Sequence, residues 1–153
     1  MRSGLLRLWR HGSLVWRLSW RERGLLLQVW WMLHGVALAL RWASFRRVYG
    51  FLGRRVGTTP PTVGDEMQLA DRAYALTRLV QGAAAWSLHH PTCLHRSLTL
   101  WWLLGRQGIA SELRIGVRKE QGRFEAHAWA EYKSGALNAG LDVGSRLAPF
   151  QSF

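Results

Sequence analysis

The feature that most constrains the fold is a change of apolar periodicity near Gly108. Before it, apolar residues recur at helical spacing, notably over residues 65–86 and 93–105. After it, Leu113, Ile115 and Val117 alternate with Arg114, Gly116 and Arg118, as in a strand with one exposed face. Because helices precede strands, the sequence predicts an α+β domain with a small antiparallel sheet.

Turn residues divide the strand region into three predicted strands. The first starts at Ile109, and residues 119–122 form a turn after it. The second covers residues 124–132. A turn at Ser134-Gly135 leads into a third strand over residues 136–142.

The N-terminal part is rich in arginine and predicted to be helical. Ser19 and Glu22 have the spacing of a capping box, which predicts a long helix running to about Arg41. Arg46 and Arg47, followed by Gly50 and Gly53, predict the end of the helical part. Residues 1–18 lack the uncharged core of a signal peptide and are expected to form a short amphipathic helix or a loose arm.

The helix predicted from Ser19 leaves two readings open. Residues 24–40 carry no charge, a length at the lower edge of a membrane span. Gln28, His34 and two glycines weaken that interpretation. The helix is therefore either buried or surface-docked, or it is membrane-associated through residues 20–42.

The segment 57–64, with two prolines and two glycines, is predicted to be a linker. It separates an N-terminal arginine-rich helical segment, residues 1–56, from a second domain, residues 65–153. In the second domain Asp65 is the predicted N-cap of the first helix, and Thr92 that of the next.

The formal net charge of +12 favours an acidic or anionic partner, or a solvated arginine face. No nucleic-acid-binding motif accompanies it, so we do not expect nucleic acid as partner. The single cysteine excludes an internal disulfide and cannot alone build a Cys-based zinc site. We expect a cytoplasmic or membrane-associated protein without a cofactor.

Cys93 is that single cysteine, and it lies where a helix is predicted to begin. A thiol is nucleophilic only as thiolate, and the positive end of a helix dipole stabilises a thiolate. First-turn amides have no helical partner and can donate to an oxyanion. The alternative is that Cys93 is simply a small buried apolar residue.

A nucleophilic cysteine needs a base, and His127 is the preferred candidate of six histidines. It lies on a predicted strand between Ala126 and Ala128, and these small neighbours leave room for a thiol and a substrate. His95 is two residues from Cys93 along one helix and projects to another face. The remaining histidines are His11, His34, His89 and His90.

A third group should orient the imidazole, and Asp142 is the preferred candidate. A two-residue turn at Ser134-Gly135 would pair His127 with Asp142, whereas a turn one residue longer would pair it with Leu141. The other candidates are Glu125, Glu131 and Asn138.

Three stretches resemble the peptidase half of the split B protein of lasso-peptide biosynthesis. They are residues 93–98 (Cys-Leu-His-Arg-Ser-Leu), residues 106–117, and residues 124–132 with their His-Ala-Trp motif. The resemblance covers about residues 65–150. It implies a papain-related, transglutaminase-like core in which the cysteine helix packs on a small antiparallel sheet, preceded by the N-terminal helical segment.

The resemblance also implies an activity and partners. The family is expected to be a Cys-His-Asp peptidase that removes the leader from a ribosomally made precursor peptide. A small separate recognition protein presents the leader, and an ATP-dependent cyclase closes the macrolactam. Many relatives carry Asp twelve residues after the histidine, where this sequence has Ala139.

Two alternatives remain open. A transglutaminase-like amidase or acyltransferase would use the same three residues on another peptide, because only the acyl acceptor differs. A non-catalytic basic scaffold would bind a peptide or a membrane surface, and its binding would depend strongly on salt.

Overall fold

A computed structural model describes residues 20–56, 64–87, 90–120, 123–138 and 148–152 of the chain. In these residues four helices precede the strands, and the order of helices before strands is as predicted. The helices are α2 (Trp20–Trp42), α3 (Phe45–Val56), α4 (Glu66–Ala85) and α5 (Cys93–Arg106). The strands are β1 (Glu112–Glu120), β2 (Arg123–Tyr132), β3 (Gly135–Ala136) and β4 (Ala148–Ser152). The expected α+β fold, with the cysteine helix packed on an antiparallel sheet, is confirmed.

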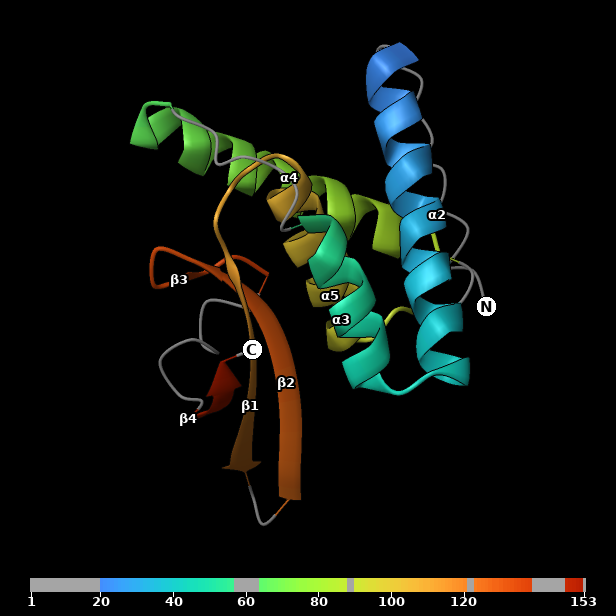
Figure 1. Ribbon diagram of the computed structural model, residues 1–153, viewed down its shortest axis with the longest axis vertical. Helices are drawn as coiled ribbons and strands as arrows, with labels where there is room; N and C mark the ends of the chain where they lie inside the picture. Colours follow the sequence, from blue (N-terminus) through green and yellow to red (C-terminus); the bar gives the residue numbers. More distant parts are fainter. Residues whose placement is uncertain (1–19, 57–63, 88–89, 121–122, 139–147, 153) are drawn as a thin grey trace, which may run out of the picture.

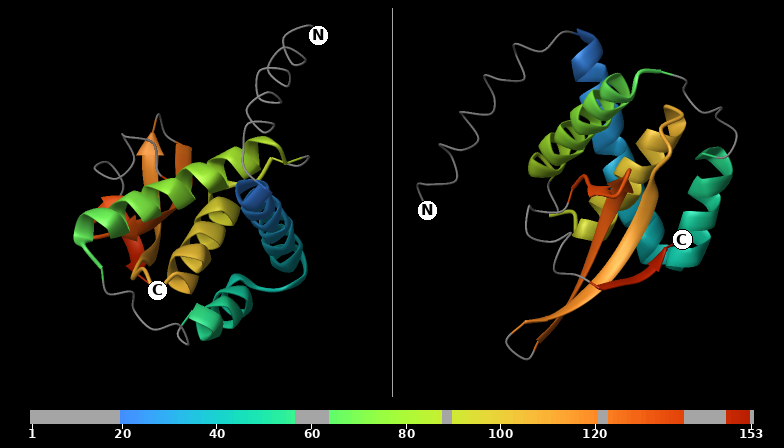
Figure 2. Two further views of the ribbon diagram at one scale, coloured as in Figure 1. Left: turned by 90° about the horizontal axis from the view of Figure 1, so that it is seen from above. Right: turned by 90° about the vertical axis from the view of Figure 1, so that its left-hand side faces the viewer.

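Helix α5 lies at the centre of the molecule, between the sheet and α2 (Figures 1 and 2). It packs against β2 on one side and against α2, α3 and α4 on the others. Leu98, Leu100 and Leu104 are fully buried, as expected for a helix surrounded by other elements. Side chains from α2 to α5 and from the sheet share one apolar core. The predicted division at residues 57–64 stays a prediction.

The N-terminal helical part consists of two helices, where the sequence predicted one helix ending before Gly50. The break lies at Ser44, between Trp42 and Phe45. Helix α3 then continues through Gly50 and Gly53, because Val48 and Leu52 of this helix are buried in the shared core. Tertiary packing here outweighs the low helix propensity of glycine. The predicted capping box begins at Ser19, outside the described residues.

Helix α2 has one face in the core and one in solvent. Val29, Leu33 and Val36 are buried at helical spacing. Within the described residues, the segment Arg23–Trp42 is long and apolar enough to cross a membrane by length and composition, although little of it is buried. The structure is thus compatible with both readings of this helix.

Helices α3 and α5 approach closely at Gly105. A Cβ atom on Gly105 would lie 2.2 Å from Cγ1 and 2.8 Å from Cγ2 of Val56. Tyr49 of α3 also stacks on Trp101 of α5, with ring centroids 4.6 Å apart. Burial, and to a lesser extent the charge of Glu112, raises the pKa of Tyr49, so its hydroxyl stays protonated at neutral pH.

The sheet has the strand order β3-β2-β1-β4, and all neighbouring strands are antiparallel. Strands β1 and β2 form its long central hairpin, close to the predicted boundaries. The edge strand β4 was not predicted; it pairs with β1 through a register shift between Ile115 and Gly116. The third strand is shorter than predicted, because β3 comprises only Gly135 and Ala136.

The turn before β3 lies one residue earlier than predicted. Lys133 and Ser134 both have positive φ, 47° and 64°, as a tight two-residue hairpin turn requires. Tyr132 therefore pairs with Gly135. The predicted pairing of Asp142 with His127 required a turn at Ser134-Gly135, and that register is wrong. Asp142 itself lies outside the described residues, so its role stays a prediction.

We expect Gly105→Ala to lower the free energy of unfolding by about 1–3 kcal/mol, because the added methyl overlaps Val56. Adding Val56→Ala should recover part of this loss by removing both overlapping methyl groups. Chemical denaturation of the single and double variants measures the effect. Gly82→Ala is the matched control, since nothing lies within 4 Å of its added Cβ and helix propensity alone should stabilise α4. Equal behaviour of the two glycine variants would refute the close approach.

Candidate active site

Cys93 is the first residue of α5, as predicted, and its thiol is free and partly exposed. Thr92 is the N-cap, in an extended conformation that turns the chain into the helix. The first main-chain hydrogen bond across this turn runs from the Arg96 amide to the Thr92 carbonyl, at 3.2 Å. Cys93 therefore lies at the positive end of the helix dipole, among amides without a helical acceptor.

His95 helps to cap this helix. Its Nδ1 lies 3.0 Å from the Thr92 amide, which donates to it, and 3.0 Å from the Thr92 hydroxyl. The ring thus reaches back to the N-cap as Glu or Gln does in a capping box. A nitrogen that accepts from an amide carries no proton, so the ring proton of His95 lies on Nε2 in this arrangement. His95 serves the helix start rather than the thiol.

The fully buried Ser97 joins the first turn of α5 to strand β2. Its hydroxyl oxygen lies 2.7 Å from the carbonyl oxygen of Cys93 and 2.8 Å from that of Ala128. The hydroxyl hydrogen serves these two acceptors. Because one oxygen touches both carbonyls, the cysteine and the residue after His127 lie at the same corner of the molecule. Sequence reasoning missed Ser97; the signal was a hydroxyl one helical turn after the cysteine, just before an apolar run in the same helix.

Asn138 completes this arrangement from the segment after β3. Its Oδ1 accepts from the Ala130 amide at 2.8 Å, and its Nδ2 donates to the Ser97 hydroxyl at 2.8 Å. The backbone donor fixes which end of the amide is oxygen. The sequence offered Asn138 as a group to orient His127, but its amide links β2 to α5 in the structure. We call Ser97, Asn138 and the main-chain groups of Cys93, Ala128 and Ala130 the Ser97 bridge.

His127 lies on β2 and is partly buried. In the antiparallel register it is opposite Gly116 of β1, which has no side chain to fill the space across from the imidazole. Strand alternation places it on the same face as Trp129 and Glu131. The structure thus brings the cysteine helix and the histidine strand together through Ser97, as the sequence required. The catalytic roles themselves stay predictions.

The face that carries His127 is held by an ion-pair network around Glu131. Arg114 lies 2.8 Å from the carboxylate of Glu112 and 3.4 Å from that of Glu131. The other carboxylate oxygen of Glu131 lies 3.4 Å from the indole nitrogen of Trp129. Glu131 was a candidate to orient His127, but its contacts serve the buried Trp129 and the arginine on β1.

The other candidate residues lie elsewhere. His34 donates from Nδ1 to the Trp30 carbonyl oxygen at 2.7 Å, one turn away in α2. His90 is exposed before α5. His11, His89, Ala139 and Asp142 lie outside the described residues, and of Glu125 only the backbone is described, paired with Arg118. In the described part of the chain, no group of three His, Cys, Asp or Glu side chains could hold a metal ion.

A pocket of about 640 Å³ lies beside the first turn of α5. It is lined by His95 and by α2 residues that include His34, Leu38 and Arg41. Its wall is mostly apolar and contains one guanidinium, that of Arg41. Helix α2 thus shares a pocket with His95, which is two residues after Cys93 in the sequence.

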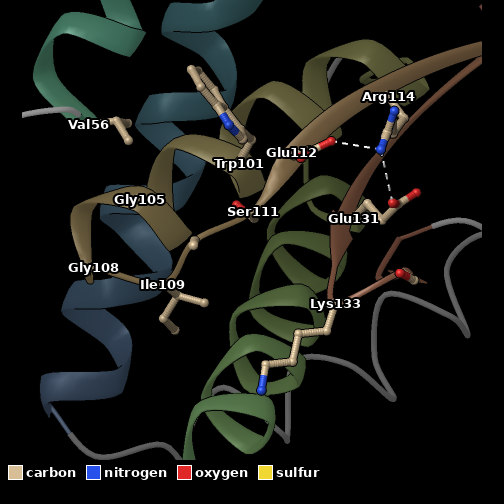
Figure 3. Close-up of a pocket in the computed structure, with 12 residues that line it drawn as sticks. Val56, Trp101, Gly105, Gly108, Ile109, Ser111, Glu112, Arg114, Glu131 and Lys133 are labelled. Atoms are coloured by element: carbon tan, nitrogen blue, oxygen red, sulfur yellow. Dashed lines mark hydrogen bonds and ion pairs between the residues drawn. The ribbon is translucent and has the colours of Figure 1, made fainter. Parts of the chain in front are cut away.

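A second pocket, of about 690 Å³, lies at the opposite end of α5 (Figure 3). Trp101 and Gly105 of α5 face the ion pairs of Arg114 across it. Gly105 lies about 18 Å along the helix axis from Cys93, at 1.5 Å per residue. This pocket therefore does not belong to the candidate thiol site.

We expect Ser97→Ala to lower the free energy of unfolding by about 1–3 kcal/mol, because it leaves the buried Ala128 carbonyl and the Asn138 amide without their partner. Asn138→Ala should have a similar effect, and the double variant should lose less than the sum of the two, as measured by urea denaturation. Thr77→Val is the control, because the Thr77 hydroxyl bonds only within its own helix, to the Ala73 carbonyl. Fully additive losses would contradict the bridge.

Comparison with known proteins agrees with this geometry. Residues 31–151 match the family model described as the transglutaminase-like superfamily. No curated protein and no solved structure matches the chain. The match starts within α2 and ends within β4, so it includes about half of α2, the other three described helices, strands β1 to β3 and most of β4. With a cysteine at the start of a central helix that is hydrogen-bonded to a histidine-bearing strand, this chain belongs to the transglutaminase-like superfamily.

Proposed function

We propose that this protein is a cysteine peptidase that removes the leader from a ribosomally made lasso-peptide precursor. The observation that carries the proposal is the Ser97 bridge, which joins the turn holding Cys93 to the residue after His127. The superfamily suggests cysteine peptidase or acyltransferase chemistry. The resemblance of the Cys93 and His-Ala-Trp stretches to lasso-peptide leader peptidases supplies the substrate class.

The proposed reaction is acyl transfer through a thioester. His127 takes the proton from Cys93, and the thiolate attacks the carbonyl carbon of the scissile peptide bond. Amides in the first turn of α5 stabilise the oxyanion. The C–N bond breaks as His127 returns the proton to the leaving amine. Water then attacks the thioester, the C–S bond breaks, and the leader is released as a carboxylic acid.

The third member of the proposed triad is Asp142. The strand register does not support this assignment. What supports it is that Asp142 is the one aspartate that follows His127 in the sequence. Asn138 and Glu131 are engaged elsewhere, by the Ser97 bridge and by Arg114 with Trp129. If Asp142 plays no part, a Cys93–His127 pair would still cleave the precursor, but more slowly, because the orienting group is not the nucleophile.

The pocket beside His95 is the proposed seat for the precursor next to the scissile bond. We further propose that a small recognition protein presents the leader to this site and that an ATP-dependent macrolactam cyclase takes over the released core peptide. The alternative is an amidase or acyltransferase on another peptide. It shares the thioester and differs in the acceptor, so adding an amine nucleophile to the reaction would yield an amide product.

We expect Cys93→Ala and His127→Ala each to abolish precursor cleavage, followed by mass spectrometry with the precursor and the recognition protein present. Iodoacetamide should alkylate Cys93 rapidly in the wild type and slowly in His127→Ala, because the base generates the thiolate. Normal processing by Cys93→Ala would refute the proposed chemistry. A thiol indifferent to iodoacetamide would favour a non-catalytic scaffold.

Asp142→Asn tests the third residue. We expect a strong fall in kcat, because an amide cannot hold the imidazole in the tautomer that accepts the thiol proton; removal of such a group elsewhere costs a factor of about 10⁴. The measurement is the single-turnover cleavage rate, and Asp71→Asn, at an exposed position of α4, is the matched control. An unchanged rate for Asp142→Asn would assign the role to Glu125 or leave a dyad.

A further inference from the structure

Helix α2 carries a line of large apolar side chains on the side that faces away from the core. Leu27, Trp31, Leu38 and Trp42 are 60%, 68%, 60% and 80% exposed, and Trp20 at the helix start is 88% exposed. At about 100° per residue these five fall within about 60° of one another around the axis. We call them the α2 stripe. The buried Val29, Leu33 and Val36 lie on the opposite side of the same helix.

This exposure is unusual for a water-soluble surface. Single exposed apolar residues are common, but a continuous line of three tryptophans and two leucines over 23 residues marks an interaction surface. Tryptophan at both ends of the stripe is also the residue preferred at the boundary between lipid headgroups and acyl chains.

The charge around the stripe has one sign. Residues 20–56 contain a single acidic residue, Glu22, against seven arginines: Arg21, Arg23, Arg41, Arg46, Arg47, Arg54 and Arg55. The four arginines of α3 and Arg41 are exposed. Arginine stems can lie along an apolar surface while the guanidinium stays at the headgroups. An apolar line bordered by cations complements a bilayer, in which anionic headgroups cover apolar acyl chains.

Helix α3 extends the same kind of surface. An apolar groove of about 390 Å³ runs between α2 and α3, with Gly35 and Ala39 on one wall and Phe51 on the other. Phe51 is exposed at its rim, and Arg47 is the charged residue in its lining. The groove has the composition to take an acyl chain beside a phosphate-bearing headgroup.

We propose that the α2 stripe and the arginines of α3 dock this protein on the surface of an anionic phospholipid bilayer, with α2 lying in the plane of the interface. Spanning is excluded for the folded chain, because Val29, Leu33 and Val36 would have to leave the core. Interfacial helices combine an apolar face with flanking cations in this way. Leu38 belongs both to the stripe and to the pocket beside His95, so docking would hold the thiol site next to the membrane surface.

The test uses the full-length protein in a flotation assay with vesicles of phosphatidylcholine alone and of phosphatidylcholine mixed with phosphatidylglycerol. We expect binding to the anionic vesicles, weakened by salt. Trp31→Gln/Trp42→Gln should lower the partition coefficient about tenfold or more, because two exposed indoles lose their apolar contact. Arg46→Gln/Arg47→Gln should weaken binding to anionic vesicles several-fold. Trp86→Gln, an exposed tryptophan just after α4, is the matched control and should bind like the wild type.

Three results would overturn the proposal. They are equal partitioning onto both kinds of vesicle, wild-type binding by Trp31→Gln/Trp42→Gln, and a stripe-dependent dimer in sedimentation without vesicle binding, which would make a second copy the occupant. The substituted side chains point away from the core, so the melting temperature should not change. Alkylation of Cys93 in solution should also be the same in these variants as in the wild type. Loss of vesicle binding therefore reports on membrane docking, and loss of alkylation reports on the proposed peptidase activity.

Discussion

The hydroxyl of Ser97 is the contact on which the candidate site depends. It lies in a fully buried position where helix α5, strand β2 and the segment after β3 meet. A helix packed on a sheet through apolar side chains alone can shift by small amounts, because dispersion contacts have little direction. Three hydrogen bonds at one oxygen fix the helix start against the residue next to His127. The arrangement thus restricts how the cysteine turn and the histidine strand, which carry the proposed nucleophile and base, lie relative to each other.

The N-terminal helices are part of this site rather than an appendage to it. Helix α2 supplies Val29 and Leu33 to the core that surrounds α5, and its Arg41 lines the pocket beside His95. Helix α3 closes on α5 at Gly105, where only a glycine leaves room for Val56. The family match likewise begins within α2. A membrane contact on the outer face of α2 would leave the core contacts of Val29 and Leu33 intact, since these two residues lie on the opposite side of the helix.

Three polar residues near the candidate site each stabilise a different part of the structure. His95 caps the cysteine helix, Asn138 holds the edge of β2, and Glu131 holds Trp129 and Arg114. Each is a titratable or amide side chain that sequence reasoning weighed as a possible partner of the thiol or the imidazole. Because these three side chains are engaged elsewhere, the proposed nucleophile and base remain Cys93 and His127, and Asp142 is the proposed third residue.

The sequence by itself determined the order of helices and strands, the start of α5 at Cys93 and the positions of β1 and β2, because helical spacing, N-caps and strand alternation are local signals. It did not determine the break at Ser44, the turn at Lys133-Ser134 or the pairing of β4, because these depend on the core that surrounds them and on residues with positive φ that no local rule favoured. The Ser97 bridge could not be predicted from the sequence either. Ser97 is 31 residues from Ala128 and 41 residues from Asn138. Only burial in a common core makes hydrogen bonds between them obligatory.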